Sequence, residues 1–224
     1  ENTEGEYSGA GGRVHPKLPQ EVGIDVSVFT RDGIERVMRY AFELALTRPK
    51  KQLTLVTKSN AQRHGMVLWD EVFEKLKHDY PGITTDRMLV DAITTRMVLQ
   101  PQSLDTIVAT NLHADILSDL AAALSGSLGI GPTANINPER TFPSMFEPIH
   151  GSAFDLVGKD LANPLGAFWS CVMMLEHLQE KKGASLLMSA IEKVCQEGQH
   201  LPKDLGGNSC TGEVTTAVCA ALKK

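Results

Sequence analysis

Two aspartates with helical spacing give the clearest chemical signal in the chain. Asp115 and Asp119 lie in the stretch NLHADILSDLAAALSGSLGI at 111–130, and a separation of four residues places both carboxylates on one face of a helix. No Lys or Arg occurs between Asn111 and Gly131 to neutralise them. Carboxylate oxygens suit Mg²⁺ or Mn²⁺, so the pair predicts a divalent-cation site. The alternative is a solvated acidic edge of a helix, which spacing alone does not exclude.

Polar residues also follow several short stretches that predict strands. Three predicted strands end in this way: 53–57 before Lys58, 87–90 before Asp91, and 106–110 before Asn111. Ligands of α/β sheets gather at the carboxyl ends of strands, so this recurrence strengthens the prediction of a site.

The remaining pattern alternates strands and helices, which favours an α/β fold. A strand is expected over 22–29 after a glycine loop at 9–12, and Thr30 is expected to cap a helix. The stretches 132–138 and 146–155 predict turns and a loop. Later helices are expected to begin at Asn163-Pro164, to span 185–197, and to follow Gly206-Gly207.

Composition narrows the class of protein. The 224 residues are 42% hydrophobic and 22% charged, enough for one large or two small domains. The net charge of −5, with no basic run longer than a lysine pair, argues against a nucleic-acid partner. No apolar run approaches the ~20 residues that span a bilayer. Four cysteines without C-x-x-C spacing predict reduced core thiols in an intracellular protein: Cys171, Cys195, Cys210 and Cys219.

Four motifs resemble one enzyme family, the metal-dependent β-decarboxylating dehydrogenases that act on isopropylmalate, isocitrate, tartrate or D-malate. They are ENTEGEYSG at 1–9, VTKSN at 56–60, the stretch 111–130 already described, and FEPIHGSAFDLVGKDLANP at 146–164. The first motif, together with RTFPSMFEPIHGSA, is most similar to the tartrate/D-malate branch.

The resemblance implies the isopropylmalate dehydrogenase-like α/β fold. Residues 1–125 would form the substrate-binding and dimerisation domain, with an interlocking arm at 13–29. Residues 126–224 would form the C-terminal part of the NAD-binding domain. The chain opens without Met and lacks the arginines that clamp substrate carboxylates in the family, so we expect it to be N-terminally incomplete.

The resemblance also assigns catalytic roles. Tyr7 would protonate the enol after decarboxylation, and Lys58 would be the general base for the substrate hydroxyl. A lysine is a base at neutral pH only when its pKa is lowered, and an adjacent divalent cation has that effect. Asp91, Asp115 and Asp119 would bind Mn²⁺ or Mg²⁺, which acts as a Lewis acid on the substrate. In the family Lys58 and Asp91 come from the second subunit, which implies a homodimer with a shared site.

The cofactor assignment rests on the resemblance, because no G-x-G-x-x-G is present. The residues implied to contact NAD are Asn60, Glu147, His150, Gly151, Ser152, Ala153, Asp155 and Asn163. Asp155 would bind the ribose hydroxyls and repel a 2′-phosphate, which favours NAD over NADP. Asn163 would contact adenine, and a pure helix-capping role is the alternative.

The expected reaction is NAD-dependent oxidation and decarboxylation of a 2-hydroxy diacid such as tartrate or D-malate. Three alternatives stay open: oxidation of 3-isopropylmalate, a catalytically silent partial chain or dimer-forming subunit, and a metal-dependent hydrolase with His113 as base. The chain departs from the family at Phe154, usually Pro, and at His113-Ala114, commonly Phe-Gly. The cytoplasm is the expected compartment, with mitochondria as the alternative.

Overall fold

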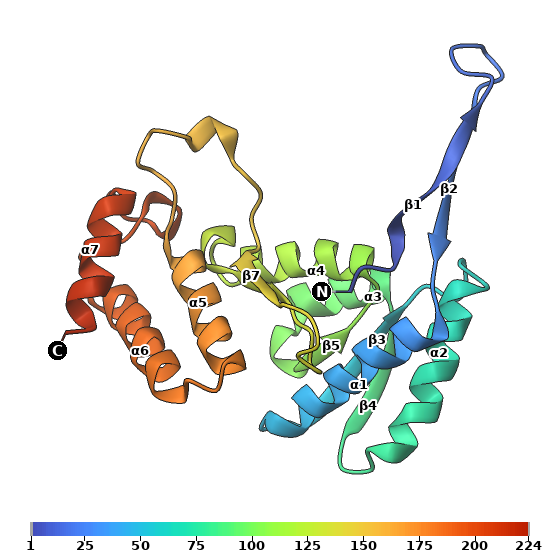
Figure 1. Ribbon diagram of the computed structural model, residues 1–224, viewed down its shortest axis with the longest axis horizontal. Helices are drawn as coiled ribbons and strands as arrows, with labels where there is room; N and C mark the ends of the chain where they lie inside the picture. The colour runs from blue at the N-terminus through green and yellow to red at the C-terminus, as the bar shows by residue number, and fades with distance from the viewer. Residues whose placement is uncertain (1, 224) are drawn as a thin grey trace. The chain divides into compact units, whose positions relative to one another are not determined.

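The computed structural model describes residues 2–223 and divides into two compact units, Glu1–Ser118 and Asp119–Lys224. The division falls within helix α4 (Asn111–Leu124). Strands and helices alternate along the first unit, so the predicted α/β class is confirmed (Figure 1). The assignment of the two parts to substrate and NAD binding stays a prediction. Among the described residues, no helix is long and apolar enough to cross a membrane.

A three-stranded parallel sheet is the centre of the first unit. Its order is β4 (Thr84–Leu89), β3 (Gln52–Thr57), β5 (Thr106–Val108), and β3 pairs with both neighbours. Every residue of β3 from Leu53 to Thr57 is buried. Helices connect parallel strands and cover both faces of such a sheet, which explains why buried residues of the central strand do not alternate with exposed ones.

Helices α1 (Arg31–Thr47) and α2 (Gly65–Leu76) pack against each other and against β3. Stacked aromatic rings join them, with Phe42 centred 5.4 Å from Phe73 and 4.6 Å from Tyr80. Thr30 caps α1 as predicted, because its side chain accepts a hydrogen bond from the Gly33 amide. Helix α3 (Val90–Leu99) begins directly after β4, so Asp91 lies in its first turn. The carboxyl edge of the sheet is thereby lined by helix beginnings.

A long antiparallel hairpin extends from the first unit (Figure 1). It pairs β1 (Gly5–Val14) with β2 (Val22–Val28), with an irregularity between Gly5 and Ala10. The predicted loop at 9–12 is therefore wrong, since these glycines lie in β1. At Gly11 the strand requires glycine, because a Cβ there would be 2.1 Å from the carbonyl oxygen of Ile24.

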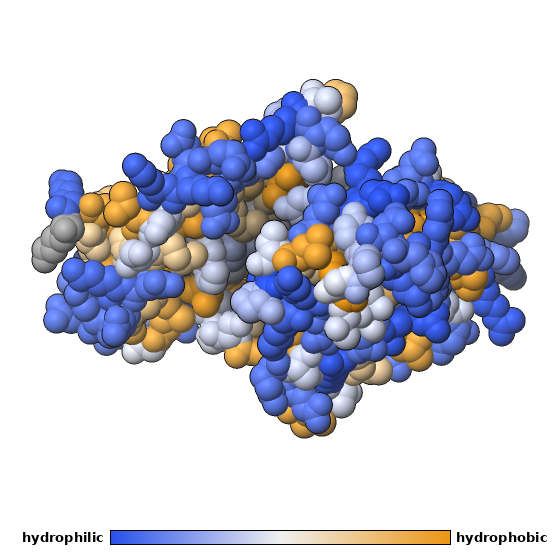
Figure 2. Space-filling model, turned by 90° about the horizontal axis from the view of Figure 1, so that it is seen from below, coloured by the Kyte–Doolittle hydropathy of each residue, from blue (hydrophilic) through white to orange (hydrophobic). Residues whose placement is uncertain are grey.

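The second unit contains a short hairpin and the helices that follow it in the chain. Strands β6 (Pro132–Asn135) and β7 (Met145–Pro148) pair with each other and lie against α5 (Leu165–His177). Helix α5 contacts α6 (Lys181–Glu197), which contacts α7 (Thr211–Ala221). Several large apolar side chains remain exposed, and Figure 2 shows hydrophobic surface on this unit. They include Leu178, Leu186 and Leu222.

Three expectations about the second unit are wrong. The turns expected over 132–138 and the loop expected over 146–155 are interrupted by β6 and β7. The cysteines are free thiols, but they are not core residues: Cys171, Cys195 and Cys219 are exposed, and Cys210 is half-buried. Each lies on or beside a helix that buries only one face, and the thiol falls on the other side.

Candidate active site

The first pair in the candidate site is Lys58 with Asp91. The Nζ atom of Lys58, directly after β3, donates a hydrogen bond to Oδ1 of Asp91 in α3. The lysine backbone carbonyl accepts bonds of 2.9 Å from the amides of Ala61 and Gln62, which fixes a turn at the strand end. The ammonium group lowers the pKa of the Asp91 carboxyl, so this carboxylate is ionised at neutral pH.

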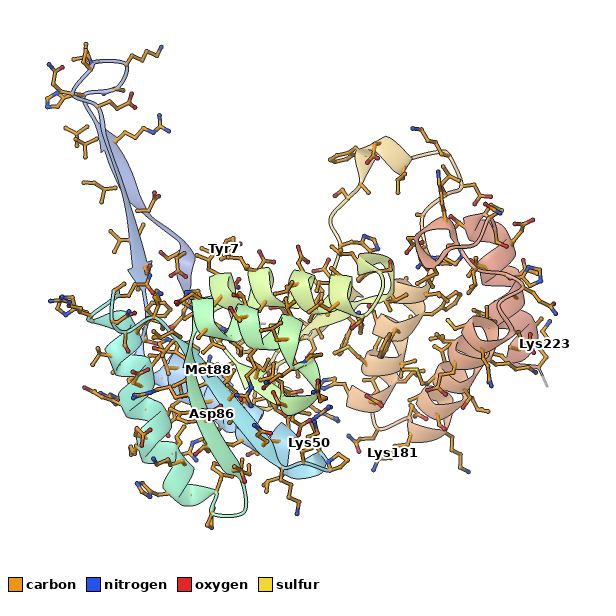
Figure 3. All side chains as sticks on the ribbon, turned by 180° about the vertical axis from the view of Figure 1, so that it is seen from behind. Tyr7, Lys50, Asp86, Met88, Lys181 and Lys223 are labelled. Carbon is orange, nitrogen blue, oxygen red and sulfur yellow. The ribbon has the colours of Figure 1, made fainter. Side chains whose placement is uncertain are left out.

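The second pair is Tyr7 with Asp115. The Tyr7 hydroxyl, on β1, donates a hydrogen bond of 3.2 Å to Oδ2 of Asp115 on α4. Tyr7 is 58% exposed, and Figure 3 labels it where β1 passes α4. A phenol that donates to a carboxylate has its proton pointed along a defined direction. The two residues come from motifs 108 positions apart, and the fold brings them together.

Hydrogen bonds hold the segment before Tyr7 in place. The Glu4 carboxylate accepts a bond of 2.9 Å from the Thr30 amide and another from the Thr30 hydroxyl, at the N-terminus of α1. Asn111 donates through Nδ2 to the backbone carbonyl of Asn2. The segment before Tyr7 is therefore tied both to α1 and to the start of α4.

The proposed metal ligands are placed on exposed surfaces. Asp115 and Asp119 are exposed on successive turns of α4, whereas Asp91 lies in α3 and bonds Lys58. Across residues 2–223, no three His, Cys, Asp or Glu side chains of one chain are grouped to hold a metal. The structure thus forms two pairs, Lys58 with Asp91 and Tyr7 with Asp115, and the assignment of a metal to these aspartates stays a prediction.

Glu6, which precedes Tyr7 in β1, is a half-buried carboxylate. Glu6 accepts hydrogen bonds at Oε1 from Ser27 (3.1 Å) and Gln62 (3.3 Å). Among the described residues, the buried atoms without a hydrogen-bond partner include Oε2 of Glu6, Oε1 of Gln62 and Nδ1 of His113. Burial lowers the pKa of His113, while the charge of Glu6 opposes that shift. His113 is only 7% exposed, so it is poorly placed to activate water as a hydrolase base.

The predicted NAD-binding loop surrounds a hollow of about 290 Å³. Four of the predicted residues line it: His150, Gly151, Ser152 and Ala153. The other lining residues are Leu156, Val157, Gly158, Asp160, Leu161, Ala162 and Thr211. Ala153 has a φ of 41°, in the left-handed region, and starts the short helical turn Phe154–Leu156. Small residues form one part of this lining, Gly151, Ser152 and Ala153, and they leave room for close approach by a ligand.

The remaining predicted cofactor residues lie outside this hollow. Glu147 is exposed on β7, Asp155 is exposed in the turn Phe154–Leu156, and Asn60 is exposed in the turn after β3. Asn163 has a structural role, because its Oδ1 accepts a hydrogen bond of 2.9 Å from the Leu165 amide at the start of α5. Helix α5 begins one residue later than expected, so Pro164 is its N-cap and Asn163 lies before it. Contact of these four residues with NAD stays a prediction.

Sequence reasoning missed Asp204. Its Oδ2 accepts hydrogen bonds from Asn163 Nδ2 at 2.8 Å and from the Ser127 hydroxyl. The Ser127 hydroxyl also accepts from the Gly129 amide at 2.8 Å. One carboxylate thus joins three segments that are distant in sequence. The only local signal was the position of Asp204 just before Gly206-Gly207, which marks a turn and not a contact.

Comparison of the whole sequence with known proteins shows the family to which the chain belongs. The profile of the isocitrate/isopropylmalate dehydrogenase family matches residues 1–220, and the chain belongs to this family. It is 65% identical over 222 residues to a probable tartrate dehydrogenase/decarboxylase, TtuC', of Agrobacterium vitis, covering 99% of this chain and 62% of that protein. It is 49% identical over 227 residues to a decarboxylating D-malate dehydrogenase of Escherichia coli strain K12, covering 99% of this chain and 63% of that protein.

A solved structure supports the same family assignment. The crystal structure of isocitrate dehydrogenase from Methylococcus capsulatus superposes with a TM-score of 0.93 at 38% identity, covering all of this chain and 66% of that one. The predicted isopropylmalate/isocitrate dehydrogenase fold is therefore confirmed. The chain spans about three fifths of the length of the curated relatives it matches.

Proposed function

We propose that the full-length protein oxidises and decarboxylates a 2-hydroxy diacid, tartrate or D-malate, using NAD and Mn²⁺ or Mg²⁺. The observation that carries the proposal is the 3.2 Å hydrogen bond from the Tyr7 hydroxyl to Asp115. It places a proton donor beside a predicted metal ligand, where a reaction that ends in protonation of an enol needs one. The relatives named above as tartrate and D-malate dehydrogenases support the substrate class.

Asp91, Asp115 and Asp119 fit a hard divalent cation by the chemistry of their donors, because all three offer exposed carboxylate oxygens. When bound, the cation would polarise the substrate hydroxyl and stabilise the negative charge of the enolate. Asp91 is ionised and available as an anionic ligand once Lys58 exchanges its bond for one to substrate. Before substrate binds, the Lys58 ammonium group donates its hydrogen bond to this carboxylate.

Lys58 and Tyr7 would move the protons. In the oxidation step Lys58 Nζ, in its neutral form, takes the proton of the substrate hydroxyl, and NAD accepts the hydride. After loss of CO₂, Tyr7 Oη gives a proton to the carbon that carried the carboxylate. Lys58 directly follows β3 and Tyr7 lies on β1, and placement beside or within a strand supports these roles because it restricts where each side chain can reach.

NAD would bind at the hollow formed by the 150–162 segment. Asp155, exposed beside this hollow in the turn Phe154–Leu156, would accept hydrogen bonds from ribose hydroxyls. Its negative charge would oppose a 2′-phosphate, which supports NAD in preference to NADP.

A second copy of the chain is the proposed partner. The alternating residues Val22, Ile24, Val26 and Val28 lie on one face of β2 and are 43–49% exposed. A row of apolar side chains on a projecting strand is a surface that association would bury. In such a dimer, the Lys58–Asp91 pair of one copy would complete the Tyr7–Asp115 pair of the other.

The test is formation of NADH by the full-length protein, followed by absorbance. Tartrate isomers, D-malate and 3-isopropylmalate are compared with NAD⁺ or NADP⁺, with Mn²⁺ or with chelator. We expect NADH with tartrate or D-malate and none after chelation. Turnover of 3-isopropylmalate alone would replace the substrate assignment, and absence of any turnover by the folded, metal-loaded protein would overturn the proposal.

A further inference from the structure

One residue fastens the predicted nucleotide loop to a helix. The backbone carbonyl of Asp160 accepts a hydrogen bond of 2.9 Å from the Thr211 amide, and its Oδ1 accepts one of 3.1 Å from the Gly212 amide. The Cys210 thiol also donates to the Asp160 carboxylate, which raises the pKa of that thiol. Three consecutive residues at the start of α7 thus bond the same aspartate.

A further bond reinforces this junction two residues along the loop. The Thr211 hydroxyl donates to the backbone carbonyl of Ala162 at 2.6 Å. Amides at a helix N-terminus have no partner within the helix, and a carboxylate is favoured there by the helix dipole. Asp160 supplies both the carboxylate and a carbonyl, so it satisfies the first turn of α7 from outside the helix.

The backbone of Asp160 restricts which residues can do this. Its φ is 54°, in the left-handed region, where Asn, Asp and Gly are tolerated and other side chains are strained. Glycine would keep this backbone shape but lose the carboxylate. Asparagine would keep the shape and one acceptor oxygen.

The junction forms part of the wall of the hollow. Asp160, Ala162 and Thr211 all line it, together with His150 to Ala153. We propose that Asp160 is a positioning residue, which holds the 150–162 segment against α7 and so keeps the hollow in the shape that binds a dinucleotide. The nucleotide part rests on the proposed function, whereas the fastening of the segment does not.

Hydrogen exchange of the full-length protein tests the fastening without any ligand. Peptides covering 150–162 should exchange about tenfold faster in Asp160→Gly, and within about threefold of the unsubstituted protein in Asp160→Asn. Thr211→Val, which loses only the hydroxyl, should also accelerate exchange, and Thr211→Ser should not. Peptides from α6 serve as the internal reference. Unchanged exchange in both Asp160→Gly and Thr211→Val would overturn the proposal.

Titration with NADH, followed by its fluorescence, tests the consequence for binding. We expect Asp160→Gly to raise the Kd about tenfold, with kcat at saturating NAD⁺ within about twofold and Asp160→Asn near the unsubstituted protein. Faster exchange with an unchanged Kd would overturn the positioning role. If the unsubstituted protein binds no NADH but the exchange results are as expected, the proposed cofactor is wrong. The role of Asp160 in holding the 150–162 segment against α7 is then still supported.

Discussion

The ammonium group of Lys58 bonds the carboxylate of Asp91 across the carboxyl end of the parallel sheet. Lys58 follows β3 and Asp91 begins α3, so the parallel register of β3 with β4 brings them together. A predicted base and a predicted metal ligand therefore share a hydrogen bond within one chain.

Replacement of Lys58 by methionine should remove the base and leave the metal site. We expect kcat for oxidation to fall about 10²- to 10⁴-fold, because a positioned proton acceptor contributes that much. Mn²⁺ affinity should change little. Steady-state NADH formation and Mn²⁺ titration measure the two effects, with Lys75→Met on the exposed face of α2 as the matched control. A Lys58→Met protein with normal kcat would refute the role of Lys58.

Asp115→Asn, in contrast to Lys58→Met, should weaken the binding of Mn²⁺. The amide keeps the size of the side chain but loses the charge, so Mn²⁺ affinity should fall about tenfold or more. Titration of Mn²⁺ by its electron paramagnetic resonance signal measures this. Glu43→Gln, an exposed carboxylate on α1, is the control for loss of one negative charge. Equal Mn²⁺ affinity in Asp115→Asn and the unsubstituted protein would contradict the ligand assignment.

His113→Phe should stabilise the fold, most of all in acid. Burial lowers the pKa of His113 in the folded state. As the pH falls below about 6.5, the unfolded chain therefore takes up the proton first, and the folded state loses stability until its own lower pKa is passed. The variant cannot take up this proton. Its gain in Tm should thus be larger at pH 5 than at pH 8.

Thermal unfolding at the two pH values checks this expectation. His78→Gln, which alters an exposed imidazole, is the control. A gain in Tm for His113→Phe that is the same at both pH values would show that packing alone is responsible.

Ile24→Lys should weaken self-association and leave the unit folded. The side chain is 49% exposed on the apolar face of β2, so a lysine there meets solvent in a single chain and desolvation in a dimer. Sedimentation velocity of the full-length protein should show a shift from dimer to monomer. Asp25→Lys changes the adjacent residue on the opposite face and should keep the dimer. Loss of the dimer in both variants would not fit an interface on this face.

Gly129→Ala should destabilise the second unit. A Cβ there would be 2.5 Å from Oδ2 of Asp204 and 2.8 Å from Cβ of Asn163, so we expect a loss of about 1–3 kcal/mol in the free energy of unfolding. Gly183→Ala is the matched control, since its Cβ would be 3.6 Å from Leu175 and helix propensity should add up to about 1 kcal/mol. Denaturant unfolding measures both. Equal effects would mean that the Asp204 contacts are easily rearranged.

Sequence reasoning located what local patterns encode. The run Leu53–Thr57 consists of leucine, valine and threonine, and it predicted β3, the strand buried on both faces. The cap of α1 was likewise visible from Thr30, whereas α5 begins one residue later than expected, with Pro164 at its N-cap and Asn163 before it. Strand ends and helical spacing singled out Lys58, Asp91 and Asp115, the resemblance added Tyr7, and the structure joins the four residues in two pairs.

The rest depends on contacts between distant residues. Strands β6 and β7 have four residues each, are bounded by proline, and exist because they pair with each other. Asp204 is 41 residues from Asn163 and 77 from Ser127, so no periodicity or motif links them. Asp160 similarly meets Gly212 across 52 residues. Such side-chain contacts arise only when the chain is folded.

The order of strands in the sheet bears on how the protein is made. The central strand β3 precedes both of its neighbours in sequence, and the later of these, β5, ends at Val108. During synthesis β3 leaves the ribosome before either neighbour, so its pairing cannot be completed until β5 has also emerged. All three strands lie within the first unit, so from then on the sheet can assemble without waiting for the second unit to fold.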